Sequence, residues 1–236
     1  MLQPILTLPS GTELKGGSPG SAVKSLTLHT AVNAGQEFTI GSAFSDYIEA
    51  EIWADPDGSL QITAGDALTY YRQDDAGSRT KVGIFYAEKP TRTRRNSYKV
   101  TAYDTMSKLD ADFSGWLRAN QAQFPKTIWQ LVQLACQRAG VALASSSLPI
   151  NGSYSVQAFY ADDLTCRQII SWAAEAAGCY AHMNADGKLQ FLTYTDKRST
   201  AKITPDGANN STAYYADSLS YEDYTVKAIE KVQIRQ

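Results

Sequence analysis

Apolar and polar residues alternate along much of the first hundred positions. The alternating runs cover residues 23–32, 38–53, 60–63, 68–72, 82–88 and 97–102. Turn-forming stretches separate them at residues 34–35, 55–58, 74–78 and 91–96. Short strands at this spacing predict an antiparallel sheet or a small barrel. Residues 1–22 are rich in Gly, Pro and Ser and predict an extended arm or a first short strand.

The hydrophobic period lengthens after residue 125, where two helix starts are encoded. Thr127 precedes Gln130 by three positions, and Thr165 precedes Gln168 in the same way. This is the capping-box arrangement, in which the N-cap hydroxyl and the glutamine side chain satisfy each other's backbone N–H groups. Gly140 and Gly178 stand where the two helices should end. The sequence therefore predicts two short capped helices.

The second of these helices has an apolar stripe. Ile169, Trp172, Ala173 and Ala176 follow one another at spacings of three and four residues. Residues at these spacings share one face of a helix. We therefore expect Trp172 to lie in the core.

The chain after the second helix returns to a strand pattern. Residues 179–183 and 188–194 flank the sequence NADG at residues 184–187, whose Asp-Gly pair predicts a hairpin. Residues 196–212 are polar and loop-like, and residues 226–234 again alternate like a strand. No partner strand follows that last run, so either another chain completes its sheet or the sequence is truncated.

These patterns together predict a β-rich α+β protein. We divide it into an N-terminal arm (1–22), a first β-barrel domain (23–105), an α/β insert with two short helices (106–195) and a partial second β domain (196–236).

Composition adds a bias toward protein contacts. Charged residues make up only 19% of the 236 positions, below the roughly 25% that is usual for globular domains. The 14 Tyr and 4 Trp suit both half-buried strands and interfaces. The net charge of −2 gives no field that would attract nucleic acid. The sharpest basic cluster, Arg92, Arg94, Arg95 and Lys99, alternates like the solvated face of a strand pair.

The cysteines and the hydropathy argue against a disulfide-linked secreted protein and against a membrane protein. Cys136, Cys166 and Cys179 are odd in number, widely spaced and set among apolar neighbours, so we expect buried free thiols in a reducing compartment. No segment approaches the ~18 apolar residues of a membrane helix, and the first ten residues do not resemble a signal peptide.

Two loops imitate known sites without meeting their requirements. The sequence GGSPG at residues 16–20 fits the nucleophile elbow around Ser18, but Pro19 lacks the backbone N–H that the elbow needs. The residues Asp55, Asp57, Ser59, Gln61 and Asp66 imitate a calcium loop, but its glycine is misplaced and no Glu closes it. We expect a tight turn there and no activity at Ser18.

The remaining chemistry-bearing residues form no motif. His29 and His182 each lie in a predicted strand, and a metal site built on Cys179 and His182 would need ligands from elsewhere. We expect both to be histidines with ordinary hydrogen-bond partners. Carboxylates that would have to pair in space for glycosidase chemistry are Asp104, Asp110, Asp112, Asp162, Asp163 and Glu175. We assign no catalytic, cofactor-binding or metal-binding residue and expect no enzymatic activity.

Several segments resemble the baseplate hub proteins of phage and prophage tails. The likeness is carried by YKVTAYDTMSKLD at residues 98–110, residues 127–140, LTCRQIISWAAEAAGCYA at residues 164–181 and NADGKLQF at residues 184–191. IGSA at residues 40–43, IEAEI at residues 48–52 and VGIF at residues 82–85 are similar to the first barrel of such hubs. The resemblance covers about residues 23–195.

This resemblance implies a tail-tube-like barrel, an α/β insert and a second barrel. It further implies a homotrimer whose pseudo-sixfold ring links the tail tube to the tail tip, assembled in the bacterial host cytoplasm and located in the virion tail. Family members continue well past the point that corresponds to Gln236. The alternative from the residues alone is a carbohydrate-binding or carbohydrate-cleaving β protein, with Trp53, Trp116 and tyrosines as sugar platforms.

Overall fold

The computed structural model describes residues 2–32, 39–55, 57–194, 204–205 and 213–214. The chain divides into two units, Met1–Tyr194 and Thr195–Gln236. In the second unit, strands β13 (Thr204–Pro205) and β14 (Ala213–Tyr214) pair in parallel. The strand predicted at residues 226–234 lies outside the described residues. The finer division into arm, barrel, insert and second β domain stays a prediction.

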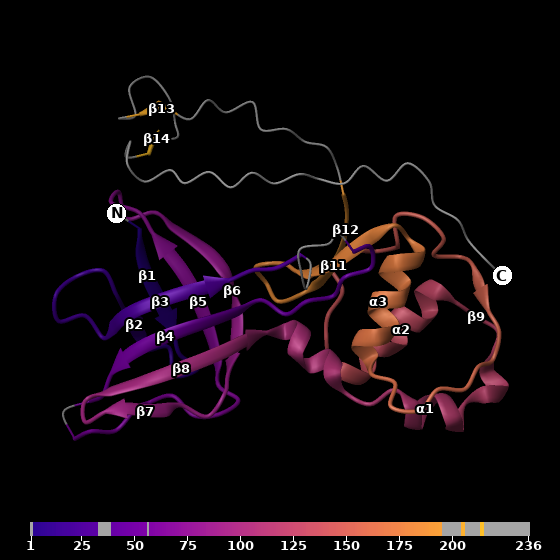
Figure 1. The fold of residues 1–236 in the computed structure, drawn as a ribbon, viewed down its shortest axis with the longest axis horizontal. Helices are drawn as coiled ribbons and strands as arrows, with labels where there is room; N and C mark the ends of the chain where they lie inside the picture. The colour runs from indigo at the N-terminus through magenta and orange to yellow at the C-terminus, as the bar shows by residue number, and fades with distance from the viewer. Residues whose placement is uncertain (1, 33–38, 56, 195–203, 206–212, 215–236) are drawn as a thin grey trace. The chain divides into compact units, whose positions relative to one another are not determined.

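One large sheet organises the first part of the first unit (Figure 1). Its strand order is β2-β1-β5-β6-β8-β4-β3, and β7 pairs with β8. All these pairings are antiparallel. The strands are β1 (Gln3–Thr7), β2 (Glu13–Lys15), β3 (Val23–His29), β4 (Tyr47–Trp53), β5 (Ala67–Gln73), β6 (Arg79–Ala87), β7 (Thr91–Arg94) and β8 (Ser97–Asp104). The predicted β-rich α+β class is confirmed.

The sheet has one buried face, as the alternation predicts. In β4 the side chains of Ile48, Ala50 and Ile52 are buried, while the residues between them are partly exposed. Their neighbours on β8, Val100 and Ala102, are fully buried. Because successive side chains of a strand point to opposite faces, these residues form one apolar layer and leave a polar face outside.

In this region the structure confirms one local expectation, contradicts two and leaves one untested. Of the two alternatives for residues 1–22, the strand is confirmed, because this segment contains β1 and β2 and β1 pairs with β5. The run at residues 60–63 is not a strand, and residues 91–94, expected as a turn, form β7. The edge strands β2 and β3 meet only near one isolated bridge, Gly16 with Val23. The antiparallel sheet is thus confirmed, whereas its closure into a barrel stays a prediction.

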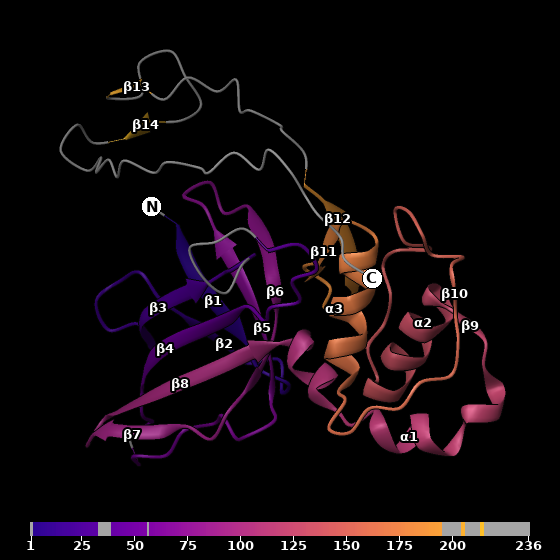
Figure 2. The same cartoon turned by 45° about the vertical axis from the view of Figure 1, so that its right-hand side comes forward.

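Helices and a hairpin form the second part of the same unit (Figure 2). The elements of this part are η1 (Thr105–Asp110), α1 (Ser114–Ala119), η2 (Gln121–Gln123), β9 (Lys126–Thr127), α2 (Ile128–Ala139), β10 (Ser155–Val156), α3 (Cys166–Ala176), β11 (Cys179–Met183) and β12 (Leu189–Thr193). Besides the two predicted helices, this part contains the short helix α1 and the 3-10 turns η1 and η2. Strands β11 and β12 form the predicted hairpin.

Both predicted capping boxes are present. The Thr127 hydroxyl accepts from the Gln130 backbone N–H at 3.1 Å, and Thr165 does the same with Gln168 at 3.2 Å. Gly140 has φ 65° and Gly178 has φ 61°, in the left-handed region that glycine adopts without steric cost. The helix starts and stops are therefore confirmed.

The predicted apolar stripe of α3 is partly wrong. Ile169 and Ala173 are buried, but Trp172 is 48% exposed and Ala176 is also exposed. The buried face instead includes Cys166, Ile170, Ala174 and Ala177. These smaller side chains let α3 pack closely against α2 and η1, which leaves the bulky indole at the edge of the contact.

Candidate functional site

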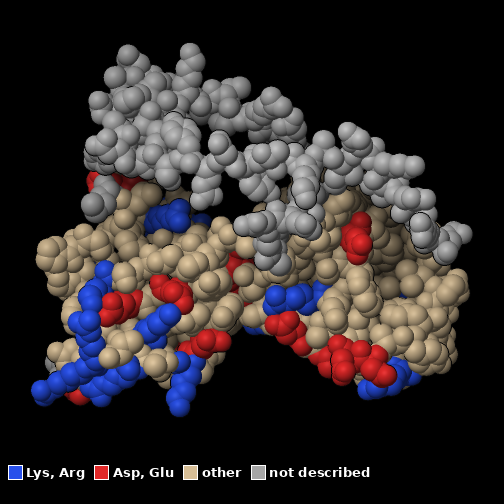
Figure 3. All heavy atoms as spheres, viewed as in Figure 1, with Lys and Arg blue, Asp and Glu red and all other residues tan. Residues whose placement is uncertain are grey.

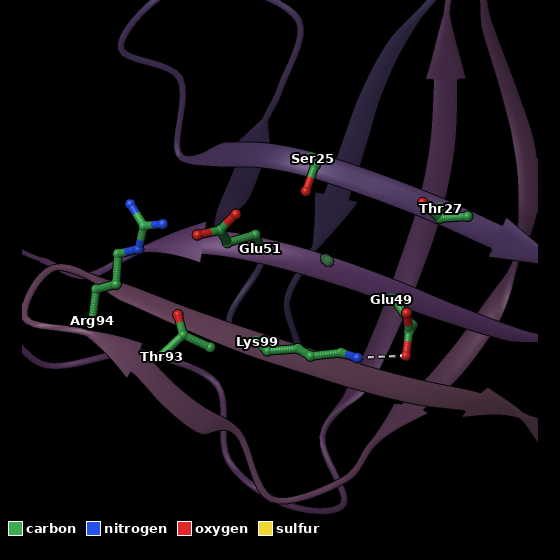
Figure 4. A pocket seen from close by; sticks show the side chains of 8 residues that line it. Ser25, Thr27, Glu49, Glu51, Thr93, Arg94 and Lys99 are labelled. Atoms are coloured by element: carbon green, nitrogen blue, oxygen red, sulfur yellow. Dashed lines mark ion pairs between the residues drawn. The ribbon is translucent and has the colours of Figure 1, made fainter.

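The outer face of the sheet contains a groove with charged walls. It has a volume of about 330 Å³, and its lining includes Ser25 and Thr27 on β3, Glu49 and Glu51 on β4, Thr93 and Arg94 on β7, and Lys99 on β8 (Figure 4). Cross-strand register brings these residues together, since Ser25 stands opposite Glu51 and Glu51 opposite Lys99. Alternation then directs all three to the same face.

The acidic residues of this groove are already paired. Glu49 accepts from Lys99 Nζ at 2.7 Å, and Glu51 accepts from the Ser97 hydroxyl at 2.7 Å and from Lys24 at 2.9 Å. The hydrogen bond from Lys99 lowers the pKa of Glu49, and the bonds from Ser97 and Lys24 lower the pKa of Glu51. Both carboxylates are thus stabilised in their charged form, which is unsuited to general acid catalysis.

The basic cluster lies where it was expected, on the exposed β7–β8 pair. Every residue of β7 is exposed. Arg92 folds back on its own hairpin: its guanidinium donates to the carbonyls of Arg94 and Arg95 and lies 5.8 Å from the Tyr98 ring. Figure 3 shows Lys and Arg side chains gathered over this end of the sheet with Asp and Glu side chains among them. The mixture interrupts the continuous positive track that a nucleic acid backbone needs.

A second polar cluster connects the sheet with the hairpin. Asp46, which directly precedes β4, approaches His182 on β11 with 3.1 Å between Oδ2 and Nε2. Beside it, Asp104 at the end of β8 accepts from the Ser45 hydroxyl at 2.6 Å and from the Met106 N–H at 3.0 Å. Asp46 and Asp104 are both buried. Sequence reasoning missed Asp46 because it lies 136 positions from its partner.

The other sequence candidates do not assemble a reactive site. Ser18 lies exposed in the loop between β2 and β3, where no helix follows it. Asp57 accepts from the Ser59 N–H and hydroxyl, which makes the expected turn. Among the described residues, no group of three or more His, Cys, Asp or Glu could hold a metal ion. Cys179 and His182 are three positions apart on β11, so their side chains point to opposite faces.

The predicted free thiols are confirmed, and three of the scattered carboxylates have partners elsewhere. Cys136, Cys166 and Cys179 are buried, and burial raises the pKa of each thiol, to about 12 for Cys136 and about 11 for Cys179. Asp110 pairs with Arg167 at 2.7 Å and Asp162 with Arg118 at 3.1 Å. Asp112 accepts from the first backbone N–H groups of α1. Asp163 and Glu175 are exposed.

The two tryptophans proposed as sugar platforms differ. Trp116 is half-buried between Phe113 and Phe124, at centroid distances of 5.1 and 6.3 Å. Trp53 is 42% exposed, and Lys24 Nζ lies 5.3 Å from the centre of its ring. Trp116 is therefore a packing residue, whereas Trp53 is open to solvent, and a lysine lies near each ring.

Solved structures share this fold. A prophage MuSo2 43 kDa tail protein from Shewanella oneidensis superposes with a TM-score of 0.57 at 13% identity, over 86% of this chain and 59% of that chain. A tail protein from Neisseria meningitidis MC58 superposes with a TM-score of 0.54 at 12% identity, over 86% of this chain and 53% of that chain. At such identities the likeness establishes the fold alone.

This chain thus spans a little over half the length of each of these tail proteins. No protein-family model matches the chain, and no curated protein matches it in sequence. None of the helices in the described ranges is long and apolar enough to cross a membrane.

Proposed function

We propose that this chain is a structural component of a phage or prophage tail and that it acts in the hub linking the tail tube to the tail tip. The observation that carries the proposal is the fold shared with two tail proteins over 86% of the chain. The sequence resemblance to hub proteins around the YKVTAYD segment at residues 98–104 supports the more specific proposal that the chain acts in the hub. The protein would assemble in the host cytoplasm and reside in the virion tail.

The surface chemistry suits such a role. The outer sheet face carries charges that are largely neutralised by neighbours, while Tyr160 and Trp172 present exposed rings on the helical part. Exposed aromatic side chains can bury much apolar area against a protein partner at low entropic cost. We propose that the natural assembly is a homotrimer that contacts tail-tube and tail-tip proteins.

We further propose that the protein is not an enzyme. The Ser18 loop lacks a following helix, and the groove carboxylates are held charged by their partners. A fluorophosphonate probe should not label Ser18, and Ser18→Ala should leave all measured properties unchanged. Labelling that disappears in this variant would overturn the assignment.

One observation favours the carbohydrate alternative. Trp53 is exposed on β4, the strand that also carries the groove residues Glu49 and Glu51. Lys24 over the ring weakens this alternative, because a sugar would have to displace that cation. A glycan array with wild type and Trp53→Ala discriminates the two functions. Binding that depends on Trp53 favours the carbohydrate function.

Assembly can be tested in solution. We expect light scattering on the full gene product to give the mass of three protomers, and we expect it to bind the tail-tube protein encoded nearby. A strict monomer at high concentration that binds neither tail-tube nor tip proteins would contradict the hub proposal. Neighbouring genes for sugar utilisation, in place of tail-tube and tape-measure genes, would also count against it.

A further inference from the structure

A single carboxylate–imidazole contact lies where the hairpin meets the sheet. Asp46 is held by the sheet, because its carbonyl accepts from the Asp104 N–H at 2.9 Å and its carboxylate lies 3.4 Å from the Ala31 N–H. His182 belongs to β11, the strand that pairs with β12. The 3.1 Å contact between their side chains therefore joins two elements that are far apart in sequence.

Few other ionisable groups face this contact. Asp104 is close enough to interact electrostatically with His182, and Tyr180 lies on the same side of β11 as His182. Across the hairpin His182 stands opposite the uncharged Gln190. At the hairpin turn, Lys81 of β6 pairs with Asp186 at 2.8 Å, with Lys188 nearby.

Water can reach the contact through a cavity of about 430 Å³ beside it. Asp46, His182 and Gln190 line this cavity together with apolar side chains of β3, β6 and β12. Protons can therefore exchange with solvent without unfolding of the whole protein.

The charge of the cluster changes with protonation. With both carboxylates ionised and the imidazole neutral, it carries two negative charges; protonation of His182 leaves one, and protonation of Asp104 leaves none. Buried uncompensated charge is unfavourable, so each added proton strengthens the junction.

The pKa values of His182 and Asp104 are shifted in the same direction. The hydrogen bond to Asp46 raises the pKa of His182, although burial opposes the shift, and burial raises the pKa of Asp104 to about 6. A raised histidine pKa stabilises the folded junction below the unfolded value of about 6.5 and loses this effect as pH rises through the folded pKa. A raised aspartate pKa likewise disfavours the folded junction as pH rises from about 4 to about 6.

We propose that Asp46 and His182 form a pH-sensitive latch that fastens the β11–β12 hairpin to the sheet, firmly at mildly acidic pH and loosely above neutrality. Strand β12 ends at Thr193, just before the second unit begins at Thr195. The latch thus sets how tightly the chain is held at the point where it leaves the first unit.

Hydrogen exchange of the β11–β12 amides at pH 5.5 and pH 8.5, corrected for intrinsic rates, tests the latch. We expect protection in the wild type to be about fivefold or more higher at pH 5.5. His182→Gln keeps an N–H donor for Asp46 but cannot take up a proton, so the ratio should fall toward one. His29→Gln is the matched control, because His29 is the chain's other histidine and lies on β3, stacked on Tyr47.

An NMR titration of the two imidazoles in the wild type keeps the test valid if His182→Gln fails to fold. We expect the signal that persists in His29→Gln, which belongs to His182, to titrate above the unfolded histidine value of about 6.5. Equal protection at both pH values in the wild type, or an undiminished ratio in folded His182→Gln, would overturn the latch. So would a His182 signal that titrates below about 6.5.

Discussion

The large sheet exposes mostly charged side chains in pairs, with Trp53 as an exposed ring, whereas the helical region exposes Tyr160 and Trp172 and fewer paired charges, such as Arg118 with Asp162. On the sheet, Lys99 meets Glu49 and Lys24 meets Glu51 across neighbouring strands. On the helical side, Tyr160 is 81% exposed and Trp172 is 48% exposed. A partner that covers the sheet must desolvate paired charges, while a partner that covers the rings removes apolar area from water. We therefore expect the surface at Tyr160 and Trp172 to be more favourable for a stable contact than the paired charges of the sheet.

The two regions also differ inside. The sheet buries the side chains of one face, among them Ile48 and Ile52 of β4. The helical region packs α2, α3, η1 and the hairpin around one continuous core that contains Phe113. We therefore expect substitutions of buried residues to lower stability more than substitutions of exposed residues in either region.

The largest effect is expected at the helical core. Phe113 is fully buried, so Phe113→Ala should lower the free energy of unfolding by about 3–5 kcal/mol. Trp172→Ala is the matched control, since it removes a larger ring that is half exposed and should cost much less. Urea unfolding measures both. A larger loss for Trp172→Ala would mean that the indole is a core residue after all.

The next effect concerns pH and the buried Asp104. Its pKa of about 6 means that the folded protein holds this proton more tightly than the unfolded chain, so folding loses stability as pH rises from about 4 to 6. Asp104→Asn should remove this dependence, which we expect to amount to on the order of 2 kcal/mol. Unfolding midpoints of both proteins from pH 4 to pH 8 measure it. Parallel curves would contradict the assignment.

The helix caps should contribute less. Thr127→Ala and Thr165→Ala should each lower the free energy of unfolding by about 1 kcal/mol, because each leaves a backbone N–H without its hydroxyl acceptor. Thr165→Ser keeps the hydroxyl and should retain most of that stability. Chemical denaturation of the three variants tests the cap, and equal losses for Thr165→Ala and Thr165→Ser would argue against it.

The smallest effect belongs to the charged sheet face. Lys99 and Glu49 are both well exposed, so solvent screens their attraction. Lys99→Ala should leave the thermal midpoint unchanged within error at physiological salt. A clear decrease that high salt abolishes would show that the paired charges stabilise the sheet, and the contrast between the two surfaces would weaken.

Local signals predicted the parts of the fold that depend on neighbouring residues. The caps at Thr127 and Thr165 each involve a glutamine three positions away, and the hairpin turn lies within residues 184–187. Whether Trp172 is buried or exposed depends instead on what packs against α3, which helical spacing alone does not specify. The hydrophobic pattern predicted a turn at β7 because its four residues are all polar and exposed, although the alternation of the basic cluster indicated a strand pair there. The contact between Asp46 and His182 arises only when the sheet and hairpin meet.

We propose above that this protein is built into a phage or prophage tail. Immunogold electron microscopy tests it most directly, with an antibody against residues 2–194 applied to tailed particles from the strain that carries the gene. We predict gold at the tip end of the tail, where tube and tip meet, and none on particles from a deletion strain. Tails that assemble normally and carry no label would contradict the account.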